Sequence, residues 1–339
     1  MSKIQRIDWI DISKAFGIIF VMFGHCYLKW QYCFWFYSFH MALFFFLSGY
    51  TFALKSGGRY LDFLKKKSRV LLTPYIFFAV CTIIINSILA ITHGNSYDFL
   101  YIGKQYLLQN RYTLLWFLTC LFLAQQIMYV IDKVISKSYK KNIYFFVSAC
   151  FFIIFFVYRK FIDVDLPWNA DLSILAVAFM CMGKQASITF KDIDISRNES
   201  IIGSIVLFII SVLVAFINFE KFSWVDWYSN KFGNPILFIF AAIFGVFSII
   251  LLSKSINSDF LTYLGRNSLV YYGLHRIIID LMFGVYGKFG IAVGDSGITA
   301  VVCSIISVLV SVCVLTLCSL FINKWCPWCI GKKKVVKND

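Results

Sequence analysis

Apolar runs as long as a lipid bilayer is thick recur along this chain. A helix rises about 1.5 Å per residue, so roughly 20 apolar residues cross a hydrocarbon core about 30 Å thick. Ten such runs lie near residues 10–28, 35–54, 70–92, 113–131, 143–158, 172–190, 201–217, 236–253, 260–283 and 299–323. Backbone polar groups in lipid must be satisfied within their own segment, which requires helices here. The sequence therefore predicts an all-α, polytopic integral membrane protein with about ten transmembrane helices.

The composition also indicates a membrane protein. Of the 339 residues, 60% are hydrophobic and 14% are charged, against about 25% charged in soluble domains. No Pro-, Gly- or Ser-rich boundary divides the chain, so we expect residues 1–339 to form a single transmembrane domain. The first run is of spanning length, carries Asp11 and Lys14, and has no small-residue cleavage site after it. No cleavable signal peptide is therefore expected.

The distribution of basic residues predicts the orientation. The net charge is +15, but Lys and Arg lie in short segments beside the apolar runs, so we expect membrane lipid and not nucleic acid as the partner. With the N-terminus inside, 22 of the 32 Lys and Arg residues fall in cytoplasmic segments and 8 in outer ones, while Lys14 and Arg276 lie within helices. The positive-inside rule then places both termini in the cytoplasm.

The 11 cysteines do not suggest a disulfide framework, because most are single and lie within apolar runs. Only Cys326 and Cys329 have a spacing with chemical meaning. One such pair cannot fill a four-ligand zinc site, and no βαβ pattern surrounds it. We expect no metal site and interpret the pair as a juxtamembrane segment, with lipid attachment or oxidation as alternatives.

The first two apolar runs contain ionisable residues, which are costly in lipid and usually functional. Lys14 and His25 are 11 residues apart, which places them on nearly the same helix face with about 16 Å of axial rise between them. Asp11 lies three residues before Lys14, near enough to offset part of its charge. A lysine within a spanning helix costs roughly 2.5 to 3.5 kcal/mol, so this polar face should point toward protein or water.

The predicted topology places all four histidines toward the outer side of the membrane. His25, His40, His93 and His275 lie at the outer ends of the first, second, third and ninth runs. Lys65, Lys66, Lys67 and Arg69 lie at the opposite, cytoplasmic side. This pattern favours a histidine-bearing site that opens outward.

The sequence resembles the membrane-bound acyltransferase family 3, and within it the fucose 4-O-acetylase-like branch. The resemblance depends on RIDWIDISKAFGIIFVMFGH followed by FHMALFFFLSGY, then KKKSRVLLTPY, LLWFL and LGRNSLVYYGLH. It extends over nearly the whole chain. It implies an enzyme of about ten helices that moves an acyl group, usually acetyl, from cytoplasmic acyl-CoA to a sugar hydroxyl of a glycan or glycolipid at the bacterial cell surface. The acyl donor would be acetyl-CoA, and the enzyme would lie in the bacterial inner membrane.

The resemblance also assigns site residues. The family pattern of Arg or Lys, ten residues, then His is met by Lys14 and His25. A pattern of two arginines separated by two residues, at the start of the third helix, is met in part by Lys66 and Arg69. Lysine acts as a point charge where arginine holds phosphate bidentately. Catalytic roles are thus implied for His25, Lys14 and Asp11, and donor binding for Lys66 and Arg69.

Each assignment has an alternative. His25 acts as general base, forms an acyl intermediate or only packs between helices. Lys14 orients the donor or balances negative charge, or it forms a buried ion pair with Asp11. Lys66 and Arg69 also fit a purely topological role. His40 and His275 are candidates for acceptor binding or packing. For the whole chain, a secondary transporter or a flippase of glycan assembly is the alternative function.

Overall fold

A computed structural model describes residues 7–54, 58–92, 94, 96–109, 111–135, 142–190, 193–291, 293–294 and 296–332. The regular secondary structure of the described residues is helical, apart from one isolated β-bridge between Asp226 and Lys231. Nine helices in these ranges are long and apolar enough to cross a membrane. The prediction of an all-α, polytopic membrane protein is confirmed.

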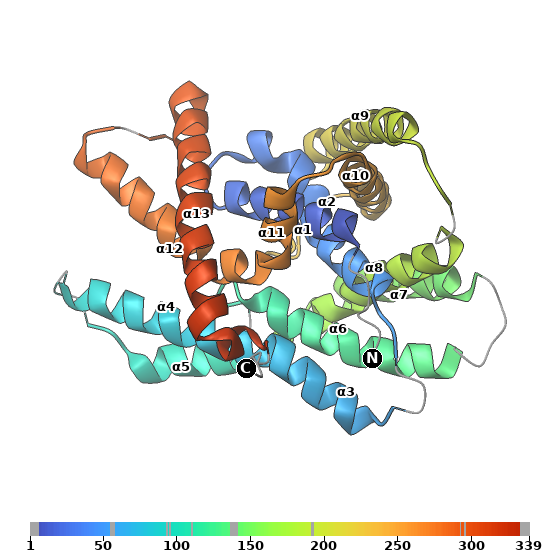
Figure 1. Ribbon diagram of the computed structural model, residues 1–339, viewed down its shortest axis with the longest axis horizontal. Helices are drawn as coiled ribbons and strands as arrows, with labels where there is room; N and C mark the ends of the chain where they lie inside the picture. Colours follow the sequence, from blue (N-terminus) through green and yellow to red (C-terminus); the bar gives the residue numbers. More distant parts are fainter. Residues whose placement is uncertain are drawn as a thin grey trace, which may run out of the picture. The chain divides into compact units, whose positions relative to one another are not determined.

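The helices follow the predicted runs closely (Figure 1). In order they are α1 (Asp8–Gly24), α2 (Trp30–Tyr50), α3 (Tyr60–Lys67), η1 (Ser68–Leu72), α4 (Thr73–Thr92), α5 (Phe99–Leu108), α6 (Trp116–Ile135), α7 (Ile143–Phe161), η2 (Pro167–Asn169), α8 (Ala170–Thr189), α9 (Arg197–Lys221), α10 (Pro235–Ser255), α11 (Asp259–Arg266), α12 (Ser268–Lys288), α13 (Gly297–Trp325) and η3 (Pro327–Ile330). The short helix α5 was not predicted. Helix α1 has 17 residues and is not among the nine apolar helices.

The third predicted run belongs to a longer helix, since α3, η1 and α4 continue from Tyr60 to Thr92. The middle piece, Ser68–Leu72, is a π-helix. Pro74, the second residue of α4, has no backbone N–H to donate to the previous turn, which accounts for the wider turn just before it. π-helical turns often occur at functional sites. Arg69, a predicted donor-binding residue, lies within this one.

The ninth predicted run is two helices. Helix α11 ends at Arg266, Asn267 adopts a non-helical conformation, and α12 begins at Ser268. The side chain of Asn267 donates a hydrogen bond to the carbonyl oxygen of Tyr263, 2.9 Å away, and so satisfies the last turn of α11. Gly265 allows α11 to lie against α1, because a Cβ at this position would overlap the carbonyl oxygen of Asp11.

The chain divides into two compact units. The first contains residues 1–47 and 190–319. In it, α1 packs against α10, α11 and α12, while α9 and α10 lie side by side (Figure 1). Ile12, Ala15, Ile18 and Met22 of α1 are fully buried. Their spacing of three or four residues places them along one side of the helix.

The second unit contains residues 48–189 and 320–339. Helix α8 packs against α6 and α7, and it continues through the charged residue Lys184 to Thr189. The ammonium of Lys184 donates to the carbonyl oxygen of Phe52 at 2.8 Å and lies 3.7 Å from a carboxylate oxygen of Asp132. These partners offset the cost of a charge within an apolar helix. That residues 1–339 act as a single domain stays a prediction.

Candidate active site

His25 lies at the end of α1 in the first unit. It is the residue that caps this helix, with φ −100° and ψ 6°. Its ring is half-buried and lies against the ring of His275, with 5.1 Å between the ring centroids and 42° between their planes. No hydrogen bond from a described residue reaches the His25 ring. Both ring nitrogens of His25 are therefore without a hydrogen-bond partner among the described residues.

His275 lies in α12 and is fully buried. Its Nδ1 is 3.0 Å from the carbonyl oxygen of Tyr271 and 2.8 Å from that of Tyr272. A carbonyl oxygen only accepts, so Nδ1 carries the hydrogen. The other nitrogen, Nε2, is buried and has no hydrogen-bond partner among the described residues. In the neutral ring, Nε2 is consequently an acceptor without a donor.

His40 lies in α2 and is also buried. Its Nδ1 donates to the carbonyl oxygen of Phe36 at 2.7 Å, and its ring lies 5.1 Å from that of Tyr37. The Tyr37 hydroxyl donates to the carbonyl oxygen of Gly24 at 2.8 Å and so joins α2 to the end of α1, one residue before His25. Three of the four histidines thus belong to the first unit, and His93 lies outside the described residues.

A cluster that sequence reasoning missed lies beside these rings. Arg276 follows His275 in α12, and its guanidinium lies over the ring of Tyr27, 4.5 Å from the centroid. The Tyr27 hydroxyl donates to Asp280 at 2.7 Å and accepts from Arg276, whose Nε also donates to Asp280 at 2.9 Å. The available signal was Arg276 within an apolar run, four residues before Asp280. The cluster places a fixed positive charge on the residue next to His275.

At the start of α1, Asp11 joins the predicted Lys14 to a second cation. Lys14 Nζ lies 3.3 Å from Oδ1 of Asp11, and Arg266 Nε lies 3.2 Å from Oδ2. Arg266 also pairs with Asp8 at 2.9 Å. Both oxygens of Asp11 are therefore engaged, and the Lys14 side chain keeps 32% of its surface exposed. The structure brings Lys14 to Asp11, whereas the axial rise from Lys14 to His25 remains about 16 Å.

The predicted donor-binding residues lie in the second unit. Lys66 and Arg69 are exposed, and neither forms an ion pair with a residue in the described ranges. The neighbouring Lys67 is partly buried, and its ammonium lies 5.3 Å from the ring centroid of Phe63 and 5.7 Å from that of Phe52. Lys66 and Arg69 are thus available to an anion, and their position relative to the histidines stays a prediction.

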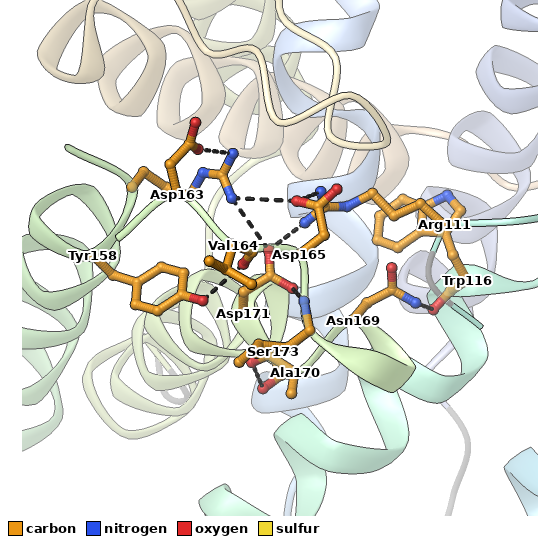
Figure 2. Close-up of polar contacts among 12 residues, drawn as sticks. Arg111, Trp116, Tyr158, Asp163, Val164, Asp165, Asn169, Ala170, Asp171 and Ser173 are labelled. Atoms are coloured by element: carbon orange, nitrogen blue, oxygen red, sulfur yellow. Dashed lines mark hydrogen bonds and ion pairs between the residues drawn. The ribbon is translucent and has the colours of Figure 1, made fainter. Parts of the chain in front are cut away.

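A second cluster that the sequence did not predict lies in the same unit and is shown in Figure 2. Arg111 pairs with both Asp165 and the fully buried Asp171. Arg159 pairs with Asp163 and lies 3.4 Å from Asp165 and 3.7 Å from Asp171. These contacts join the segment before α6 to the last turn of α7, the residues that follow it and the first turn of α8. Their separation of up to 60 positions in the chain explains why the sequence did not reveal the contact.

Backbone strain accompanies the Arg111 cluster. Arg111, Asp163, Trp168 and Asn169 have φ values of 50°, 48°, 59° and 57°, in the left-handed region that non-glycine residues seldom adopt. The Asn169 amide donates to the carbonyl oxygens of Gln109 and Trp116, at 3.1 and 3.4 Å. Such conformations persist only where the surroundings hold them in place. We infer that these ion pairs and amide hydrogen bonds stabilise the loop conformations of the second unit.

No group of three or more His, Cys, Asp or Glu side chains in the described part of the chain is placed to hold a metal ion. Cys326 and Cys329 are free thiols at η3, and the Cys329 amide donates to the Cys326 carbonyl oxygen at 3.0 Å. This backbone hydrogen bond closes a turn, and it does not indicate redox or metal chemistry at the two thiols.

Comparison with known proteins identifies the family. Residues 7–318 match the family model described as an acyltransferase domain, that of acyltransferase family 3. The matched range includes α1 with His25, α2 with His40 and α12 with His275. No curated protein and no solved structure matches the chain. Because the family model extends over nearly the whole sequence, the chain belongs to acyltransferase family 3 and is an acyltransferase with multiple membrane helices.

Proposed function

We propose that the protein is an O-acetyltransferase of the bacterial inner membrane. It would move an acetyl group from cytoplasmic acetyl-CoA to a sugar hydroxyl of a cell-surface glycan or glycolipid, as the fucose 4-O-acetylase-like branch does. The observation that carries the proposal is the half-buried ring of His25, which lies against the buried His275 in a chain of an acyltransferase family. The family favours this enzyme over the transporter or flippase considered from the sequence.

His25 is the proposed general base. Its neutral ring takes the proton of the acceptor hydroxyl as the oxygen attacks the thioester carbonyl carbon. The carbon–sulfur bond then breaks, the acetyl group forms an ester with the sugar oxygen, and the coenzyme A thiolate takes up the proton from His25. If the acetyl group is first carried on His25, a bond from the imidazole nitrogen to the carbonyl carbon forms as the carbon–sulfur bond breaks. The sugar oxygen then displaces the imidazole, and the hydroxyl proton passes to the released thiolate.

The remaining predicted residues bind or orient the substrates in this proposal. Lys66 and Arg69 are exposed cations and would bind the phosphates of the donor. Lys14, held by Asp11, would orient the donor or balance negative charge. His40 and His275 were considered for acceptor binding, but both rings are buried and use Nδ1 to bind backbone carbonyl oxygens. This favours a supporting role for both over direct contact with the sugar.

The proposal is tested by comparing the surface glycans of cells that contain the protein with those of cells that lack it. We expect a mass difference of one acetyl unit per modified sugar, and transfer of label to the glycan when membranes receive [¹⁴C]acetyl-CoA. Glycans of equal mass, together with the absence of label transfer in membranes that contain the inserted protein, would exclude this function. A transporter or flippase would instead change the amount of surface glycan without adding a labelled acetyl group.

A further inference from the structure

We propose that His275 is a positioning residue: it accepts a hydrogen bond from the ring of His25 and thereby fixes which nitrogen of His25 is left to take a proton. The inference rests on the proposed function, because it concerns the orientation of the proposed base. It assigns a role to an atom that the fold leaves buried and unpaired, the Nε2 of His275.

The tautomer of His275 is set by the backbone. Two carbonyl oxygens, those of Tyr271 and Tyr272, lie 3.0 and 2.8 Å from Nδ1, so the ring hydrogen is on Nδ1. Nε2 then presents a lone pair. A buried acceptor without a donor is destabilising, and native structures rarely leave one unsatisfied. A donor is therefore expected next to Nε2.

The His25 ring is the donor that fits. Two imidazole rings joined by an N–H···N hydrogen bond of about 2.9 Å have centroids about 5 Å apart, and the centroids of His25 and His275 are 5.1 Å apart. The rings are tilted by 42° and share no hydrogen bond in this structure. Rotation of the His25 ring about χ2, a torsion with a broad distribution, would bring an N–H toward Nε2.

The other described donors near this point are engaged elsewhere. The Cys26 thiol lies 3.4 Å from the carbonyl oxygen of Met22 and 3.8 Å from that of Ser304. The guanidinium of Arg276 donates to Tyr27 and to Asp280. The Tyr37 hydroxyl donates to Gly24. Arg276 has further N–H groups, but of these side chains only His25 has a ring contact with His275, and it has no hydrogen-bond partner of its own among the described residues.

The hydrogen bond would have a direct chemical consequence. When one nitrogen of neutral His25 donates to His275, the other must carry the lone pair. That nitrogen is on the opposite part of the ring and points away from the buried His275. His25 would thus be held as a base in a single orientation, in the way that a third group orients the base in other nucleophile and base pairs.

A spectroscopic test requires no activity. The chain has only four histidines, so uniform ¹⁵N-histidine labelling of the purified protein gives few ring signals to assign. Above the pH at which the rings are neutral, we expect His25 in one tautomer in the wild type and in a mixture of tautomers in His275→Asn. His40→Asn is the matched control: His40 has a similar backbone anchor at Nδ1, but among the described residues its ring contacts those of Phe36 and Tyr37 and not that of His25. This variant should therefore leave the His25 tautomer unchanged.

A kinetic test separates positioning from packing. The amide oxygen of Gln reaches about as far as Nε2 of histidine, whereas Asn is shorter, so His275→Gln restores an acceptor that His275→Asn lacks. With [¹⁴C]acetyl-CoA as the probe, we expect kcat to fall about 10- to 100-fold in His275→Asn and to recover in part in His275→Gln, with the KM for the donor unchanged.

A mixture of His25 tautomers in the wild type, or the same tautomer in wild type and His275→Asn, would overturn the positioning role. Equal kcat in the Asn and Gln variants would also overturn it. These results are distinct from failure of the proposed function, in which the wild-type protein itself would transfer no label from [¹⁴C]acetyl-CoA.

Discussion

Single side chains in this protein are held by partners that are distant in the sequence. Asp11 contacts Arg266, Arg111 contacts Asp171, and His25 lies against His275. Each contact lies within one of the two compact units. Charges in an apolar environment are stable only when they are paired, so loss of one partner leaves the other buried and uncompensated. The effect of a substitution is thus expected to depend on the burial of its partner.

Asp171→Asn tests the Arg111 cluster. Removing one partner of a buried ion pair typically costs about 3 to 5 kcal/mol, so we expect a clear fall in the Tm of the purified protein in detergent. Asp163→Asn is the matched control: this carboxylate pairs with Arg159 but keeps 66% of its side-chain surface exposed, and exposed pairs contribute about 0 to 1 kcal/mol. Equal Tm values for the two variants would contradict a stabilising role for the buried Arg111 cluster.

Arg69→Ala tests donor binding. Arg69 is exposed and has no ion-pair partner among the described residues, so its charge is available to a phosphate. We expect weaker binding of acetyl-CoA, with the larger loss at low salt because ions screen exposed charges. Arg59→Ala removes a nearby cation that already pairs with Asp62 at 3.3 Å and should have the smaller effect. If acetyl-CoA binds a membrane-inserted Arg69→Ala protein as tightly as the wild type, Arg69 does not bind the donor and contributes only to membrane topology.

At the scale of elements, the sequence predicted the long helices better than their interruptions. Apolar runs determine spanning helices because lipid permits little else, and all ten runs coincide with helices. The break at Asn267 was missed because it depends on a side-chain bond to Tyr263 and on contact with α1. Helix α5 lies between the third and fourth predicted runs, where no helix was expected. The ring pair of His25 and His275 joins positions 250 apart, which a single sequence does not reveal.

Gly265→Ala tests the packing of α11 on α1. The added Cβ would overlap the carbonyl oxygen of Asp11, so backbone must move. Overpacking of this kind typically costs about 1 to 3 kcal/mol, and we expect a lower Tm and lower acetyl transfer. Gly284→Ala in α12 meets no atom within 4 Å, and Ala favours a helix over Gly by about 0.5 to 1 kcal/mol. A Gly265→Ala protein as stable as Gly284→Ala would contradict the close contact.

At the scale of the whole molecule, the proposed reaction requires that acetyl-CoA reach the protein from the cytoplasm and that the glycan reach it from the outer side of the membrane. The bias of 22 to 8 basic residues predicts that the segments 55–69 and 132–142 and the C-terminus are cytoplasmic, with 94–112 and 218–235 outside. Single cysteines introduced into these segments of a protein without accessible native thiols should react with a membrane-impermeant reagent only in the outer segments. Labelling of residues 55–69 in intact cells would place this segment outside and would contradict the predicted orientation.

The central claim is that His25 performs the proton transfer. His25→Asn keeps a similar size but cannot take a proton, and a positioned base typically contributes 10²- to 10⁴-fold, or about 3 to 5.5 kcal/mol of barrier. The direct measurement is the rate of [¹⁴C]acetyl transfer from acetyl-CoA to glycan in membranes that contain equal amounts of inserted wild type or His25→Asn. We expect the variant to lose at least about 100-fold in rate while it still binds acetyl-CoA. Transfer at a rate close to that of the wild type would contradict the claim.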